Sequence, residues 1–323
     1  HQEIVKAMIA DYYKLNLTPW LKLVHLFSGR DNPSRYWASQ GRQAAGFEIE
    51  SDGEFEDVTS EIGFCYALFL ILSAMPGAML LAGFPCSMWI FLSSSYHQRT
   101  KDNVEGNTNR FLVRQANCQL RNTVVLIRIG VEARGLIALL EQPASSIAWL
   151  LKCMADLLSE CGFHRIFTHM GAFLHPIAKP SVLWTLLSEG PRLMLTYYWN
   201  AKREIFYHPT TIEDSVEDFI DEEEVPFSKP GSKAKTFKVY YSKSGGWLTG
   251  GKNLKESGIY TTRFSEVLYT AWLNDPRSNA FVAAPIGPSP QELKKALLQV
   301  WTSRVVYGPD CKRQKRIHEY FGA

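Results

Sequence analysis

Two short apolar runs, each followed by a residue with reactive chemistry, constrain the fold of this chain more than any other feature. Residues 79–83 lead to Cys86, and residues 136–140 lead to Glu141. Short, continuous apolar runs bounded by turn residues are typical of parallel strands that are covered on both faces. Ligands of open α/β sheets bind at the carboxyl ends of such strands. We therefore expect Cys86 and Glu141 to share one site.

Strand-like and helix-like segments alternate over residues 18–190, which predicts a three-layer α/β domain. Thr59 or Ser60 would cap one of its helices, and Ser145 or Ser146 would cap a later one. Residues 87–106 have no firm period, and we expect a mobile loop that covers the site. The expected strands are 21–27, 43–50, 78–84, 136–140, 163–170 and 182–187, and the expected helices are 1–17, 34–39, 60–74, 107–134 and 145–160.

The chain changes character after Gly190, so residues 191–323 are expected to form a C-terminal α+β appendage. Residues 213–224 are strongly acidic, and residues 226–251 are rich in Lys, Ser and Gly, which is typical of linkers and loops. A helix over residues 291–302 and a basic tail would follow. The expected organisation is thus an N-terminal helix over 1–17, an α/β domain over 18–190 and this extension.

Charge and cysteine content exclude several classes. The net charge is only +3, with 35 basic and 32 acidic residues, so nothing in the overall charge requires nucleic acid or an anionic membrane. The six cysteines form no CxxC pair, which indicates a reducing compartment such as the nucleus or the plastid stroma. Residues 62–98 carry no formal charge, but Pro76, Gly77 and Gly83 interrupt them, so no transmembrane span is expected. Because the sequence starts at His1, we expect a fragment or a processed form.

The first strand and the segments that follow it have the order of a cofactor-binding unit. Residues 28–33 form a turn-rich loop between the first strand and a helix. The second strand ends near Glu48 and Glu50, roughly 20 residues after the loop, where a carboxylate can bind the ribose hydroxyls of a nucleotide-type cofactor. A solvated strand end is an equally common reason for such an acid.

An ordered set of motifs resembles the S-adenosylmethionine-dependent cytosine C5 DNA methyltransferases over roughly residues 20–190. The segments GFPCSMW and LLEQPASS are similar to those of a poorly characterised group of methyltransferase-like proteins that are abundant in dinoflagellate algae. In the order of the family pattern, which places one motif after each of strands one to five, the matching residues are Phe27-Ser28-Gly29, Glu48, Asp57-Val58, Pro85-Cys86 and Glu141-Gln142-Pro143.

The resemblance implies a Rossmann-like methyltransferase fold and a specific mechanism. Cys86 would be the nucleophile that adds to C6 of a cytosine, and Glu141 would be the acid at the ring N3. The target base would leave its stack, so the partner would be nucleic acid. S-adenosylmethionine would be held by Phe27, Ser28, Gly29, Glu48, Asp57 and Pro85.

Departures from the pattern support an alternative. The loop lacks a second glycine, Ser87 follows Cys86, and Lys179-Pro180 stands where a Q-x-R-x-R strand would be expected. The chain could therefore be a catalytically inactive, methyltransferase-derived structural subunit, with protein partners in a large plastid or photosynthetic assembly. In that case Cys86 would be a buried structural thiol and Glu141 a cap before Ser145.

No metal site is expected from the sequence. Cys161, His164, His169 and His175 form the most suggestive cluster. His164 and His169 are separated by an odd number of residues, so on a strand they would point to opposite faces. This geometry argues against a shared metal ion.

Overall fold

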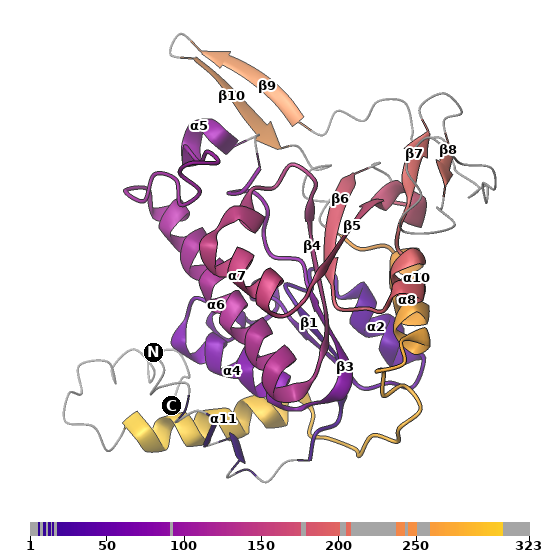
Figure 1. Cartoon of the computed structure of the whole chain (residues 1–323). Helices are drawn as coiled ribbons and strands as arrows, with labels where there is room; N and C mark the ends of the chain where they lie inside the picture. The colour runs from indigo at the N-terminus through magenta and orange to yellow at the C-terminus, as the bar shows by residue number, and fades with distance from the viewer. Residues whose placement is uncertain are drawn as a thin grey trace.

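A six-stranded mixed sheet forms the centre of the protein, as a computed structural model shows (Figure 1). In spatial order its strands are β2 (Ala44–Phe47), β1 (Leu21–Leu26), β3 (Ala74–Ala82), β4 (Ile137–Pro143), β6 (Pro180–Thr185) and β5 (His164–His169). The structure describes residues 6, 9–10, 12–13, 15, 18–90, 93–175, 179–200, 205–207, 237–242, 245–250 and 259–305.

Strand direction is uniform over most of the sheet and reverses at one strand. β1 pairs in parallel with β2 and β3, and β3 pairs in parallel with β4. β6 runs antiparallel to both of its neighbours, β4 and β5. The expected pair of strands at the end of the domain is therefore an antiparallel unit. The whole is an α/β fold that is compatible with the expected Rossmann-like class.

Helices cover both faces of the sheet (Figure 1). Because the central strands β3 and β4 are buried on both sides, each contains a continuous apolar run, residues 78–82 in β3 and 137–140 in β4, which explains the runs in the sequence. One face is covered by α4 (Glu61–Leu72), α6 (Phe111–Arg134) and α7 (Lys152–Glu160), and α11 (Pro290–Val305) packs on α4. The other face is covered by α2 (Asn32–Ser39), α8 (Glu189–Leu193) and α10 (Thr262–Asn274).

The remaining elements are short. The 3-10 helices are η1 (Gly53–Glu56), η3 (Ala148–Leu150) and η4 (Met170–Phe173), and the short α-helices are α3 (Ile49–Asp52) and α5 (Ser94–His97). Two small antiparallel sheets pair β7 (Tyr198–Asn200) with β8 (Ile205–Tyr207) and β9 (Phe237–Ser242) with β10 (Gly245–Gly250). β9 and β10 fall within residues 226–251, where the sequence predicted linker and loop.

Helix caps decide two alternatives left by the sequence. Ser60 caps α4, because its side chain accepts a hydrogen bond from the Gly63 N–H. The expected helix over 145–160 is wrong at its start, since α7 begins only at Lys152. The Ser146 hydroxyl does not cap α7; it donates to Gln142 Oε1 at 3.1 Å and accepts from the Ala148 N–H at 3.3 Å.

Residues 87–106, which were expected to form a mobile loop, include α5 and are tied together by Arg99. The Arg99 guanidinium lies 3.6 Å from the centre of the Trp89 ring. It also donates to the Met88 carbonyl at 2.7 Å and to the Val104 carbonyl at 2.6 Å. Arg99 is buried, so these contacts hold a charged group in the interior of the segment.

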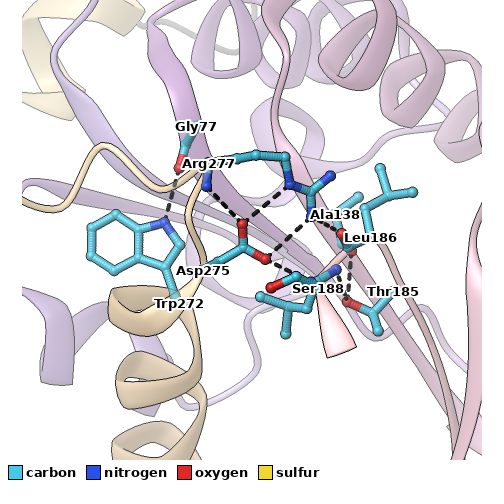
Figure 2. A network of polar contacts seen from close by, with 9 residues as sticks. Gly77, Ala138, Thr185, Leu186, Ser188, Trp272, Asp275 and Arg277 are labelled. Atoms are coloured by element: carbon cyan, nitrogen blue, oxygen red, sulfur yellow. Dashed lines mark hydrogen bonds and ion pairs between the residues drawn. The ribbon is translucent and has the colours of Figure 1, made fainter. Parts of the chain in front are cut away.

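The C-terminal part of the chain returns to the sheet through α10. Trp272 donates from its indole N–H to the Gly77 carbonyl at 2.9 Å, and the Asp275 carboxylate accepts from the Ser188 N–H and from Arg277 (Figure 2). Phe264 and Leu268 of α10 belong to the same apolar cluster as the sheet residues beneath them. The boundary expected at residue 190 would assign α10 to a separate appendage, whereas in the structure α10 forms part of the layer over the sheet.

Three predictions lie outside the described residues: most of the helix over 1–17, the acidic stretch 213–224 and the basic tail. Within the described ranges, no helix combines the length and the apolar character needed to cross a membrane.

Candidate functional site

The carboxyl ends of β1, β3 and β4 form the edge where the sequence placed the site. β2 lies on one side of β1 and β3 on the other, so the order of the strands reverses at β1. Open α/β sheets bind ligands at this kind of switch point, outside the carboxyl ends of the strands. A ligand at this edge would therefore contact three segments: the loop after β1, the residues after β3 and the last residues of β4.

The loop after β1 has an unusual backbone. Phe27, Gly29 and Asp31 all have positive φ, at 59°, 55° and 59°. For the two residues with side chains this conformation costs about 1–2 kcal/mol each. A Cβ built on Gly29 would meet no atom within 4 Å, so the space next to the backbone is open. Ser28, between them, is buried, and its N–H donates to the Phe47 carbonyl at 3.1 Å.

Glu48 is the acid that contacts this loop. Its Oε2 accepts a hydrogen bond from the Gly29 N–H at 2.8 Å. The backbone N–H of Glu48 donates to Glu56 Oε2 at 2.6 Å, and Glu56 Oε1 pairs with Lys294 of α11 at 2.6 Å. The position of the candidate cofactor acid thus depends on a helix far away in the sequence.

Asp57 and Pro85 are less directly placed for binding. The Asp57 Oδ1 accepts from the Thr59 N–H and from the Thr59 hydroxyl, both at 2.8 Å. These bonds hold the turn that precedes α4. Pro85 is exposed, directly before Cys86.

Cys86 follows β3 as a half-buried thiol with charged neighbours. Burial raises the pKa of the Cys86 thiol, the Lys179 ammonium opposes this effect, and the Glu141 carboxylate adds to it. The thiol is therefore mostly protonated at neutral pH, and it becomes a stronger nucleophile when the Glu141 charge is neutralised. Cys86 and Glu141 are close enough to influence each other electrostatically.

Glu141 lies in β4 and is buried, with 4 % of its surface exposed. Its Oε1 accepts from the Ser181 hydroxyl at 2.7 Å and pairs with Lys179 Nζ at 3.1 Å. Its Oε2 accepts from the Tyr260 hydroxyl at a longer 3.4 Å. Within the described residues these donors come from the start of β6, from the residue directly before it and from the segment before α10, so Glu141 is part of a buried polar network and not a helix cap.

Gln142 ties the two strand ends together. Its side-chain N–H donates to the carbonyl of Phe84, two residues before Cys86, and its oxygen accepts from Ser146 at 3.1 Å. The amide thereby fixes the position of the residues that carry Cys86 relative to β4.

A buried histidine lies under the same region. His25 is fully buried on β1, and its ring centroid lies 5.8 Å from that of Tyr260. Its Nδ1 is 3.4 Å from Asp31 Oδ1, but neither ring nitrogen makes a hydrogen bond with another described residue. No sequence pattern had drawn attention to this residue.

Sequence reasoning also missed Ser181 and Tyr260, and it noted Lys179 only as a departure from a motif. Ser181 and Tyr260 lie 40 and 119 residues after Glu141, so no local spacing connects them to it. No group of three or more His, Cys, Asp or Glu side chains arranged to hold a metal ion occurs in the part of the chain that the structure describes. No protein-family model matches this chain, and no curated protein matches its sequence.

Proposed function

We propose that this protein is an S-adenosylmethionine-dependent methyltransferase that acts on a cytosine-type base through Cys86. The observation that carries the proposal is the electrostatic neighbourhood of Cys86, Glu141 and Lys179 at the switch point of the sheet. A thiol supplies the nucleophile for addition to a pyrimidine ring, a carboxyl can protonate the ring nitrogen, and the Lys179 ammonium favours the thiolate. A mostly parallel sheet with an antiparallel strand near one edge also suits the Rossmann-like methyltransferases.

The loop after β1 fits the cofactor. The open space beside Gly29 would admit a ligand close to the backbone, and Glu48 offers its carboxylate at the end of β2. Phe27, Ser28 and Asp57 would line the same end of the sheet, with Pro85 toward Cys86. When bound, S-adenosylmethionine would supply an electrophilic methyl group.

The chain's own residues would make the acceptor ring nucleophilic. The Cys86 thiol would lose its proton to water, its sulfur would form a bond to C6, and the electron pair of the C5–C6 double bond would move to C5. Glu141 would bind or protonate N3 through Oε2, since Oε1 is already held by Ser181 and Lys179. After methylation, a water molecule would take the C5 proton, the electron pair of the C5–H bond would re-form the C5–C6 double bond, and the C6–S bond would break with its electron pair returning to sulfur. The thiol would then be released.

Titration calorimetry with S-adenosylmethionine tests cofactor binding. We expect micromolar affinity, and we expect Glu48→Ala to weaken it by about tenfold or more, as the loss of a hydrogen bond to a charged group does. Glu54→Ala, at an exposed acid close by in sequence, is the matched control and should change little. Absence of binding to the natural protein, or equal binding by Glu48→Ala, would contradict the proposed cofactor site.

The nucleophile is tested separately, with tritiated cofactor and cytosine-containing DNA. Cys86→Ala should abolish methyl transfer while cofactor binding is kept, and Cys118→Ala, at an exposed thiol, should retain activity. Full activity of Cys86→Ala would exclude the covalent mechanism.

A specific surface feature favours the second candidate function, that of an inactive structural subunit. Phe281 and Ile286 are 85 % and 98 % exposed. The backbone on both sides of Ile286 is fixed, because the Gln43 side chain donates to the Pro285 carbonyl at 2.6 Å and accepts from the Gly287 N–H at 3.2 Å. Exposed apolar side chains on a fixed backbone are suited to contact with another protein. Purification of the native protein tests this candidate, since a monomer without partners would contradict it.

A further inference from the structure

Tyr260 enters the candidate site from the C-terminal part of the chain and is held there rigidly. Its ring stacks on that of Phe264, with centroids 4.9 Å apart and an angle of 22°. Its backbone carbonyl accepts from the Asn32 side chain at 2.6 Å. Only 8 % of its surface is exposed, and its hydroxyl points to Glu141 Oε2. The residue is thus fixed from both α2 and α10 before any ligand binds.

Gly83 provides the space that Tyr260 occupies. A Cβ built on Gly83 would lie 2.3 Å from the Tyr260 hydroxyl oxygen, so any larger residue would clash with it. The φ of Gly83 is not positive, which means that space and not backbone conformation accounts for the glycine. The Tyr260 hydroxyl therefore lies against Gly83, the first residue of the segment that connects β3 to Cys86.

The two oxygens of Glu141 are held very differently. Oε1 is anchored by Ser181 at 2.7 Å and by Lys179 at 3.1 Å. Among the described residues, Oε2 has a single hydrogen bond, the 3.4 Å contact from Tyr260. A long hydrogen bond between a phenol and a carboxylate is weaker than a short one, so Oε2 is the carboxylate oxygen that a ligand can bind more easily. A ligand can bind Oε2 only if the Tyr260 hydroxyl is displaced from it.

We propose that Tyr260 is a positioning residue that closes the Cys86–Glu141 site in the free protein: its ring fills the space over Gly83 and its hydroxyl holds Glu141 Oε2. A ligand must offer a polar group of its own to Oε2 in place of that hydroxyl, and a ligand without one is rejected. The proposal rests on the proposed function only in taking Cys86 and Glu141 as the working groups of the site.

Alkylation of Cys86 by iodoacetamide, followed by peptide mass spectrometry, tests the closure without cofactor or substrate. Tyr260→Ala removes the ring, and Gly83→Ala displaces it. Each variant should accelerate labelling of Cys86 by about tenfold, because the reagent can reach the thiol without a local opening of the structure. Tyr260→Phe keeps the ring and should stay within about twofold of the natural protein at saturating pH.

The hydroxyl is tested by the pH dependence of the same reaction. The charged and titratable groups that act on the Cys86 thiol are Lys179, Glu141 and Tyr260. In Tyr260→Phe the Glu141 carboxylate loses a donor, so its charge acts more strongly on the thiol, and the midpoint of alkylation should move up by about half a pH unit. A merely structural tyrosine would leave the midpoint unchanged.

Two other cysteines serve as internal controls. Cys65 is buried in α4, so its labelling reports unfolding, and Cys161 is half-buried far from Tyr260 in sequence and should keep its rate. Unchanged Cys86 labelling in folded Tyr260→Ala or Gly83→Ala would overturn the closure. If both of these unfold, an unchanged pH midpoint in Tyr260→Phe overturns the proposal and a raised midpoint supports it. Failure to bind S-adenosylmethionine would leave these results standing, so the two proposals fail separately.

Discussion

Removal of the Asp275 carboxylate should destabilise the protein by a predictable amount. Asp275 has a fully buried side chain that accepts from the Ser188 N–H at 2.7 Å, from the Arg277 N–H at 2.9 Å and from Arg277 Nε at 3.1 Å (Figure 2). In Asp275→Ala the Ser188 and Arg277 N–H groups lose their partner, at about 1–3 kcal/mol for a buried donor. The Arg277 side chain is half exposed, so water can solvate its charge. We expect a loss of about 2–3 kcal/mol in the free energy of unfolding.

Urea denaturation followed by tryptophan fluorescence measures this loss, and its pH dependence gives a second check. Burial alone would raise the pKa of Asp275, but the bonds from Arg277 and from the Ser188 N–H outweigh burial and lower it. A lowered pKa means that the carboxylate stabilises the fold above its unfolded pKa of about 3.9 and that this contribution is lost as the pH falls through the folded pKa. The difference between the natural protein and the variant should therefore shrink in acid.

A matched control lies on the same helix. Glu266 pairs with Arg263 at the surface, and Glu266→Ala should cost less than about 0.5 kcal/mol. An Asp275→Ala variant that is no less stable than this control at pH 7, or a difference that persists unchanged at pH 3, would refute the reasoning.

Two further predictions concern residues of β1 and its loop. Gly29→Ala forces a side chain into a positive φ and should cost about 1 kcal/mol of stability, and it should also weaken any binding of S-adenosylmethionine, measured by calorimetry. Lys22 is buried and donates to the carbonyls of Asn279 and Val282, and burial, followed by the charge of Arg42, lowers its pKa to about 8. A lowered lysine pKa costs stability while the group is charged, so the natural protein should gain stability relative to Lys22→Met as the pH rises from about 8 to 10, measured by urea denaturation.

Each of these has its own control. Gly41 also has a positive φ and open space around its Cβ, so Gly41→Ala should reproduce the loss of stability and leave cofactor binding unchanged. If both glycine variants bind S-adenosylmethionine equally, the loop after β1 is not the cofactor loop. Equal pH profiles for Lys22→Met and the natural protein would show that Lys22 stays charged throughout.

The sequence predicted the central strands because burial on both faces leaves a direct trace in composition. β1, β3 and β4 are buried along most of their length, so their apolar runs are visible without any tertiary information. Cys86 follows β3 and Glu141 lies near the end of β4, which continues to Pro143, and the parallel pairing of β3 with β4 brings the ends of the two strands to one edge. The roles assigned to the two residues stay predictions.

The hydrogen-bond partners of Glu141 could not be predicted from the sequence, for a physical reason. Ser181 reaches Glu141 because β6 runs back antiparallel to β4, with Glu141 opposite Leu183, and only the register of the pair determines this contact. Tyr260 reaches it because α10 docks on the sheet. The misplaced start of α7 has a similar origin, since Ser146 has the composition of a cap but its hydroxyl is already bound to Gln142.

The return of α10 to the sheet also has a consequence for the order in which the protein can be made. The face formed by Leu23, Met79, Leu81 and Leu139 is complete once β6 has been synthesised, but its cover includes Phe264, Leu268 and Trp272 of α10. At about 5–20 residues per second, the ribosome needs roughly 4–18 seconds to travel from the end of β6 to the end of α10. Throughout that interval the nascent chain presents an apolar sheet face to solvent or to a chaperone, so the synthesis of α10 sets the earliest time at which this layer can be completed.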